Sequence, residues 1–234
     1  MSSTTPLSEP FTEADDPLLL AADQAVALLR DAPWRRFAVL GDSIAAGTGD
    51  PSPGYASTGW ADRVAATLSA ANPALAYRNT GRVGATSTQV REHQLPGILE
   101  FAPDLVHVSC GGNDLFEAGG DPGLLRENLS AMFTALTEAG ALVSVFTVAD
   151  VWGVERMAPM RAMRPRMAAM NEVIRSVATE YDAVLTEFWD HPVRTRATLM
   201  SADLIHFTTS GHAVVASEVI RALARRLDRS QGTR

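Results

Sequence analysis

The chain has 234 residues, of which 46% are hydrophobic, and its formal net charge at pH 7 is −7. This length suits one domain with a substantial core and is short for two. The acidic balance argues against a nucleic-acid partner, because binding to phosphates requires clustered basic charge. No apolar run approaches the ~20 residues needed to cross a bilayer, so we expect no membrane partner.

The N-terminal region lacks the pattern of a secretory signal. Several acidic residues precede the short apolar run at residues 18–20, and Asp23 interrupts that run. We therefore predict a mobile segment at residues 1–14, a single domain at residues 15–230, and a cytoplasmic location. The only cysteine, Cys110, stands beside an apolar run and is interpreted as a small core residue.

Apolar runs of strand length alternate with segments of helical periodicity along the chain. A first helix is predicted at residues 18–29, after the start signal Asp16-Pro17. Strands are predicted at residues 37–40, 75–78, 105–109, 142–146 and 183–185. Further helices are predicted at residues 60–71, 87–101, 123–139, 165–181 and 209–227. This alternation is typical of a parallel sheet covered by helices on both faces.

The predicted fold is therefore α/β, a three-layer sandwich around a flavodoxin-like parallel sheet of about five strands. In such sheets, ligands bind beyond the carboxyl ends of the strands. Polar and glycine-rich clusters follow the first three strands, and another precedes the last helix: Gly41-Asp42-Ser43, Gly84-Ala85-Thr86, Gly111-Gly112-Asn113-Asp114 and Asp203-Leu204-Ile205-His206. We expect these four clusters to meet at one rim of the sheet.

Three of these side chains have the chemistry of a nucleophilic triad. A serine hydroxyl such as Ser43 is a weak nucleophile until an imidazole such as His206 takes its proton. A carboxylate such as Asp203, on the far ring nitrogen, fixes the tautomer of the ring and stabilises the imidazolium. The Asp-x-x-His spacing would put the two side chains on the same side of a helical turn.

An attacked carbonyl also needs hydrogen-bond donors for its developing negative charge. The candidates are the backbone N–H groups of Ser43 and Gly84 and the side-chain amide of Asn113. Glycine at position 84 would let the backbone approach a substrate without a Cβ in the way. Asp42 and Asp114 are interpreted as carboxylates that brace the loops, and His191 as a remote substitute base.

These four clusters, in this order and spacing over residues 37–212, resemble the SGNH (GDSL-type) serine hydrolase family. The resemblance implies that Ser43 is the nucleophile, that Gly84 and Asn113 form the oxyanion hole, and that Asp203 and His206 complete the triad. Residues 34–49 and the run at 110–114 are similar to a branch of the family common in actinomycetes. The chain departs from the commonest pattern at Ile44, where the family name has Leu, and at Phe207-Thr208.

Three functions follow from these residues. The first is hydrolysis of a small-molecule ester or thioester through an acyl-serine intermediate, with no metal and no organic cofactor. The second uses the same triad for acyl transfer or ring closure, as in a tailoring enzyme of secondary metabolism. The third is a non-catalytic binding protein, which the intact set of triad and oxyanion residues disfavours.

Four arginines alternate with four methionines between residues 156 and 167. If this segment overhangs the site, Arg161 and Arg164 could bind a substrate carboxylate or phosphate, and the methionines could line an apolar pocket. The alternative, which we favour, is a solvated amphipathic face.

Overall fold

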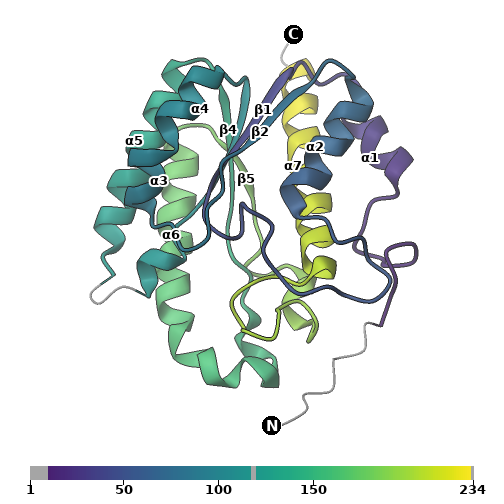
Figure 1. The fold of residues 1–234 in the computed structure, drawn as a ribbon, viewed down its shortest axis with the longest axis vertical. Helices are drawn as coiled ribbons and strands as arrows, with labels where there is room; N and C mark the ends of the chain where they lie inside the picture. The colour runs from purple at the N-terminus through teal and green to yellow at the C-terminus, as the bar shows by residue number, and fades with distance from the viewer. Residues whose placement is uncertain (1–9, 117–119, 233–234) are drawn as a thin grey trace.

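The protein is described here by a computed structural model that covers residues 10–116 and 120–232. Its centre is a parallel five-stranded sheet with the strand order β2-β1-β3-β4-β5 (Figure 1). The strands are β1 (Arg36–Gly41), β2 (Ala76–Asn79), β3 (Leu105–Ser109), β4 (Leu142–Phe146) and β5 (Val184–Thr186). This is the flavodoxin-like order expected from the sequence.

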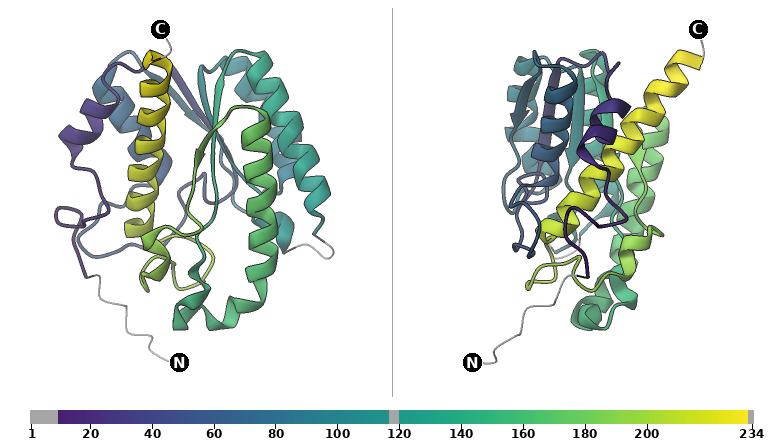
Figure 2. Two further views of the ribbon diagram at one scale, coloured as in Figure 1. Left: turned by 180° about the vertical axis from the view of Figure 1, so that it is seen from behind. Right: turned by 90° about the vertical axis from the view of Figure 1, so that its right-hand side faces the viewer.

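Helices cover both faces of the sheet and form the outer layers of the sandwich (Figure 1). One face carries α1 (Ala22–Leu28), α2 (Trp60–Ala71) and α7 (Thr209–Gly232). The other carries α3 (Ser87–His93), α4 (Leu95–Phe101), α5 (Pro122–Glu138) and α6 (Arg164–Glu180). Seen from behind, the two long helices α6 and α7 come forward on either side of β5 (Figure 2). No helix in the described ranges is long and apolar enough to span a membrane.

The central strands consist of nearly continuous apolar residues, as strands that are buried on both faces require. All five residues of β3 are buried, because helices cover both of its faces. Phe37 of β1 pairs in register with Leu105 of β3, which in turn pairs with Leu142 of β4. All five strands start and end within one residue of their predicted positions.

The segment predicted as one helix at residues 87–101 is two helices that meet at Gln94. Pro96 has no N–H to donate to the preceding turn, which favours a break at this place. The Gln94 side chain then bonds to both backbone groups of Gly41: its Oε1 accepts from the Gly41 N–H at 2.9 Å, and its Nε2 donates to the Gly41 carbonyl at 2.8 Å. The break thus lets α4 secure the end of β1.

The N-terminal arm, which begins within the segment predicted to be mobile at residues 1–14, contacts the domain. Residues 1–9 lie outside the described residues. Glu13, however, donates its N–H to the Gly54 carbonyl at 3.0 Å and pairs with Arg63 at 2.5 Å. These contacts hold the arm against the domain at Glu13.

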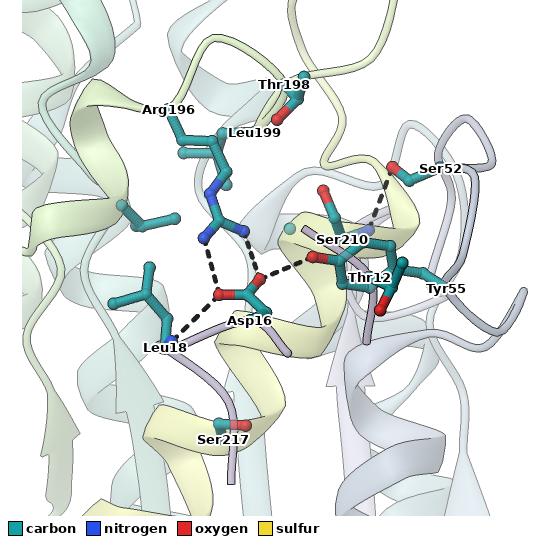
Figure 3. A network of polar contacts seen from close by, with 12 residues as sticks. Thr12, Asp16, Leu18, Ser52, Tyr55, Arg196, Thr198, Leu199, Ser210 and Ser217 are labelled. Atoms are coloured by element: carbon teal, nitrogen blue, oxygen red, sulfur yellow. Dashed lines mark hydrogen bonds and ion pairs between the residues drawn. The ribbon is translucent and has the colours of Figure 1, made fainter. Parts of the chain in front are cut away.

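The arm is held more deeply by Asp16, whose carboxylate is fully buried (Figure 3). It accepts two bonds from the guanidinium of Arg196, at 2.6 and 2.9 Å, one from the Tyr55 hydroxyl at 2.8 Å and one from the Leu18 N–H at 3.0 Å. The Asp16 carboxylate also holds Leu18 in a turn through the bond from its N–H, and this turn takes the place of the expected start of the first helix. The helix accordingly begins at Ala22 and not at residue 18.

We expect Asp16→Ala to lower the free energy of unfolding by about 3–5 kcal/mol, because the substitution removes the fully buried carboxylate from a buried ion pair and breaks its hydrogen bonds. Urea unfolding measures this loss. The control is Glu180→Ala, which breaks the half-exposed pair of Glu180 with Arg126 and should cost less than about 1 kcal/mol. Equal losses in the two variants would contradict the anchoring role of Asp16.

Candidate active site

The strand order reverses between β1 and β3, where the chain leaves the centre of the sheet in opposite directions. Crevices at such switch points are the usual ligand sites of this fold. Ser43 follows β1, and Asn113 follows β3 at the start of the short 3-10 helix η1 (Asn113–Leu115). A Cβ at Gly41 would lie 1.9 Å from the Ser109 carbonyl oxygen, so only glycine permits this approach of the two strands.

Ser43, His206 and Asp203 form one chain of hydrogen bonds. The Ser43 Oγ lies 2.8 Å from the His206 Nε2, and the His206 Nδ1 lies 2.6 Å from the Asp203 Oδ2. With the Nδ1 proton donated to the carboxylate, the Nε2 lone pair faces the serine hydroxyl. The three side chains are therefore arranged for transfer of the serine proton to the ring.

Asp203 and His206 sit in a loop turn and not in the helical turn suggested by their spacing. Leu204 between them has a left-handed φ of 63°. The Asp203 Oδ1 accepts the backbone N–H groups of Ile205 and His206 at 2.9 and 3.1 Å. Burial opposes ionisation of Asp203, but the bonds from His206 and from these N–H groups hold its pKa below the ordinary value.

The loop that carries His206 is tied to the loop that follows Ser43, and the two lie together at the lower end of the sheet in Figure 1. The Ser201 N–H donates to the His206 carbonyl at 2.7 Å, and the Ser201 Oγ accepts the Asp50 N–H at 2.8 Å. The Asp50 carbonyl accepts the N–H of Thr209, the first residue of α7, at 2.9 Å. These bonds fix the base relative to the nucleophile.

The three expected oxyanion donors come from the loops after β1, β2 and β3. Within the described chain, the backbone N–H groups of Ser43 and Gly84 have no acceptor. The Asn113 Nδ2 donates to the Ala85 carbonyl at 3.0 Å, which brings the β3 loop against the β2 loop and leaves its second N–H available. A Cβ at position 84 would meet open space, so glycine is favoured there by its φ of +79° and not by crowding.

Asp42 and Asp114 brace the two loops, in line with their interpretation from the sequence. Asp114 accepts the Ser87 N–H at 2.9 Å and the Ser87 hydroxyl at 2.5 Å, and Asp42 accepts the Ile44 N–H at 2.9 Å. Burial raises the pKa of Asp42 to about 6, against the effect of hydrogen bonds from the Ile44 and Ala45 backbone. The carboxyl group next to the nucleophile in the sequence therefore takes up a proton more readily than an ordinary aspartate does.

We expect Asp42→Asn to become more stable than the wild type as pH rises. A pKa raised in the folded state contributes stability below about pH 4, and this contribution is lost as pH rises through about 6. The amide stays neutral, so its advantage in the free energy of unfolding should grow to at most about 3 kcal/mol by pH 7. Thermal unfolding from pH 4 to 8 tests this, with the exposed Asp228→Asn as a control. A pH-independent difference would contradict it.

The remaining histidines described by the structure lie outside the triad. His107 is a core residue: burial lowers its pKa to about 3, and its Nδ1 lies 2.8 Å from the Ser144 Oγ. His212 bonds to the Thr48 carbonyl at 3.1 Å, and His191 lies 3.4 Å from Glu218, away from Ser43. Cys110 is buried, as expected, and burial together with the nearby carboxylates raises the pKa of its thiol.

A largely apolar cavity of about 110 Å³ opens beside Ser43. Five of the eight methionines of the chain line it: Met157, Met160, Met167, Met170 and Met200. Four of them come from the alternating Arg/Met segment or from the first turns of α6 that follow it. The methionines thus line an apolar pocket, which was the less favoured of the two interpretations of this segment, while Trp152 and Ile174, which share its wall, carried no signal in the sequence.

Arg161 and Arg164 face a separate depression, together with Arg194 and Asp150. Arg164 is paired with Asp150 at 2.6 Å, and the Arg161 Nε donates to the Trp152 carbonyl at 3.2 Å. Neither arginine lines the cavity beside Ser43. Although arginines and methionines alternate in this segment, Arg161 and Arg164 thus face one depression, and Met157, Met160 and Met167 line the cavity.

The fold and this constellation define a serine hydrolase site in an α/β sandwich. A model of the GDSL-like lipase/acylhydrolase family matches residues 39–214. The chain therefore belongs to this family. Proteins that resemble it in structure include esterases.

Three solved structures illustrate the likeness. That of TesA is 26% identical, with a TM-score of 0.65, and the match covers 81% of this chain and 98% of the other. An acetylxylan esterase from Geobacillus stearothermophilus is 20% identical, covering 80% and 93%, with a TM-score of 0.65. The esterase EstA from Pseudoalteromonas sp. is 17% identical, covering 83% and 99%, with a TM-score of 0.64. Among curated proteins, none matches the chain.

Proposed function

We propose that the protein hydrolyses small carboxylic esters through an acyl-serine intermediate, with Ser43 as nucleophile, His206 as base and Asp203 as the residue that orients the base. The observation that carries this proposal is the unbroken hydrogen-bonded chain from the Ser43 Oγ through the His206 ring to Asp203. The proposal also places the chain in the actinomycete-like branch of its family and in the cytoplasm.

The reaction begins when His206 Nε2 takes the proton of Ser43 as its Oγ attacks the ester carbonyl carbon. Asp203 stabilises the imidazolium that forms. The oxyanion of the tetrahedral intermediate accepts from the free N–H groups of Ser43 and Gly84 and from the Asn113 amide. His206 then returns the proton to the leaving alkoxide, which leaves an acyl group on Ser43.

In the second half of the reaction, a water molecule gives a proton to His206 as its oxygen attacks the carbonyl carbon of the acyl-serine. His206 then returns that proton to the Ser43 Oγ as the bond from this oxygen to the acyl group breaks, and the carboxylic acid is released. Hydrolysis requires that water reach the acyl-enzyme. The Asp203 side chain is 47% exposed, so the triad lies at the solvent boundary. This exposure favours hydrolysis over the alternative of acyl transfer, which works best where water is excluded.

A fluorophosphonate probe should label the protein covalently at Ser43, as detected by intact mass. Ser43→Ala should abolish labelling, while Ser69→Ala, an exposed serine on α2, should label normally. With a chromogenic acetyl ester, Ser43→Ala and His206→Ala should lower kcat by several orders of magnitude, and Asp203→Asn somewhat less. Normal turnover by folded Ser43→Ala would overturn the mechanism.

Asn113→Ala should lower kcat about 10²–10³-fold with little change in KM, because the amide is asked to bind charge that exists only in the transition state. Steady-state kinetics with the acetyl ester measures both constants. A change confined to KM would instead mean that Asn113 binds the substrate in its ground state.

A further inference from the structure

The cavity beside Ser43 runs from an exposed mouth to a buried floor. At the mouth, Phe116 and Ile205 are 45% and 43% exposed. At the inner end, Met170 and Ile174 of α6 are each only 3% exposed, and both belong to the core between the sheet and the helices α3 to α6. The cavity therefore enters the hydrophobic core and is more than a surface groove.

One face of α6 forms its long wall. Met167, Met170 and Ile174 follow one another at spacings of three and four residues, which align side chains on one side of a helix. Seven residues of α-helix span about 10 Å, at about 1.5 Å for each residue. Opposite this wall, Val108 of β3 and Val145 of β4 close the cavity.

Apart from the indole of Trp152, whose Nε1 is buried and has no hydrogen-bond partner within the described residues, the polar side chains of the lining lie at one end. The hydroxyl, carboxyl and amide side chains of the lining belong to Asp42, Ser43, Ser109 and Asn113, all at the carboxyl ends of β1 and β3. Beyond them, a polar acyl substituent would lose its hydration without gaining a partner from a side chain of these kinds. An aliphatic chain would lose nothing there and would gain apolar contact.

We propose, on the basis of the function proposed above, that this cavity binds the acyl part of the substrate and selects an aliphatic chain of about four to six carbons. The size sets this limit. A cavity of about 150 Å³ holds a benzene molecule, and the cavity here measures about 110 Å³. The flexible methionine walls can yield to admit the last carbons, as thioether side chains adapt readily to irregular shapes.

The proposal predicts how kcat/KM depends on the length of the acyl chain. Each methylene that enters an apolar site contributes about a fourfold gain in kcat/KM. The rate constant should therefore rise about fourfold for each methylene from acetyl to butanoyl and hexanoyl esters. It should level off or fall at octanoyl and dodecanoyl esters, once the chain meets Ile174. p-Nitrophenyl esters of these acids, assayed below their aggregation limits, measure the profile.

Matched variants test whether Ile174 forms the floor of the cavity and Met167 part of its wall. Ile174→Ala should move the optimum to chains about two methylenes longer, while Ile98→Ala, an equally conservative change at a buried position of the same core outside the cavity, should leave the profile unchanged. Met167→Trp should move the optimum toward acetyl, and Met163→Trp, outside the lining, should not. If the alanine variants fail to fold, Ile174→Val paired with Ile98→Val should show the same shift on a smaller scale.

The outcomes separate this inference from the proposed function. Labelling of Ser43 and hydrolysis of the acetyl ester, combined with a flat length profile or with equal shifts in Ile174→Ala and Ile98→Ala, would overturn the inference alone. If no ester is hydrolysed, the proposed function fails. Binding of hexanol, which cannot react, then tests whether the cavity accepts an aliphatic chain. Saturable binding of hexanol, measured by tryptophan fluorescence, supports the acyl site if Met167→Trp weakens it and Met163→Trp does not. The absence of such binding overturns the acyl site.

Discussion

The close approach of the β1 and β3 backbones at Gly41 is the constraint on which the site depends. A side chain there would collide with the Ser109 carbonyl, and the Gln94 amide holds both backbone groups of the same glycine. The Asp42 N–H then donates to that Ser109 carbonyl at 2.9 Å, which turns the chain directly after the strand. Ser43 thus emerges beside the loop that carries Asn113, and nucleophile and oxyanion donors share one rigid base.

Two carboxylates near His206 are driven in opposite directions by their surroundings. Asp203 lies close to solvent and accepts three hydrogen bonds, which lower its pKa and keep it charged beside the ring. Asp42 is buried behind the serine, and burial raises its pKa. The same kind of side chain is thus driven in opposite directions by solvent contact and hydrogen bonding at one position and by burial at the other.

The polar and apolar halves of the site are built from different kinds of structure. Ser43 and Asn113 follow the buried strands β1 and β3, where backbone bonds limit movement, and Gly84 lies in the loop after the edge strand β2. The cavity is walled by methionines of α6 and of the 3-10 helix η3 (Glu155–Met163), whose side chains have many rotamers. A rigid catalytic end maintains the geometry of bond breaking, while an adaptable apolar end can accept chains of more than one shape.

The sequence by itself determined the strands and the sheet type, and it singled out the three side chains that the structure joins in one hydrogen-bonded chain. Buried parallel strands must be apolar throughout, so β3 and β4 could be located to the residue, and short polar clusters at strand ends have few roles other than ligand binding. The tertiary structure alone decided that the Gln94 side chain holds Gly41, that Asp16 and Arg196 anchor the arm, and that the loop of His206 lies against Ser43. It also decided that the methionines face Ser43 while Arg161 and Arg164 face elsewhere. Each of these depends on contacts between segments far apart in the chain, and local periodicity carries no record of such contacts.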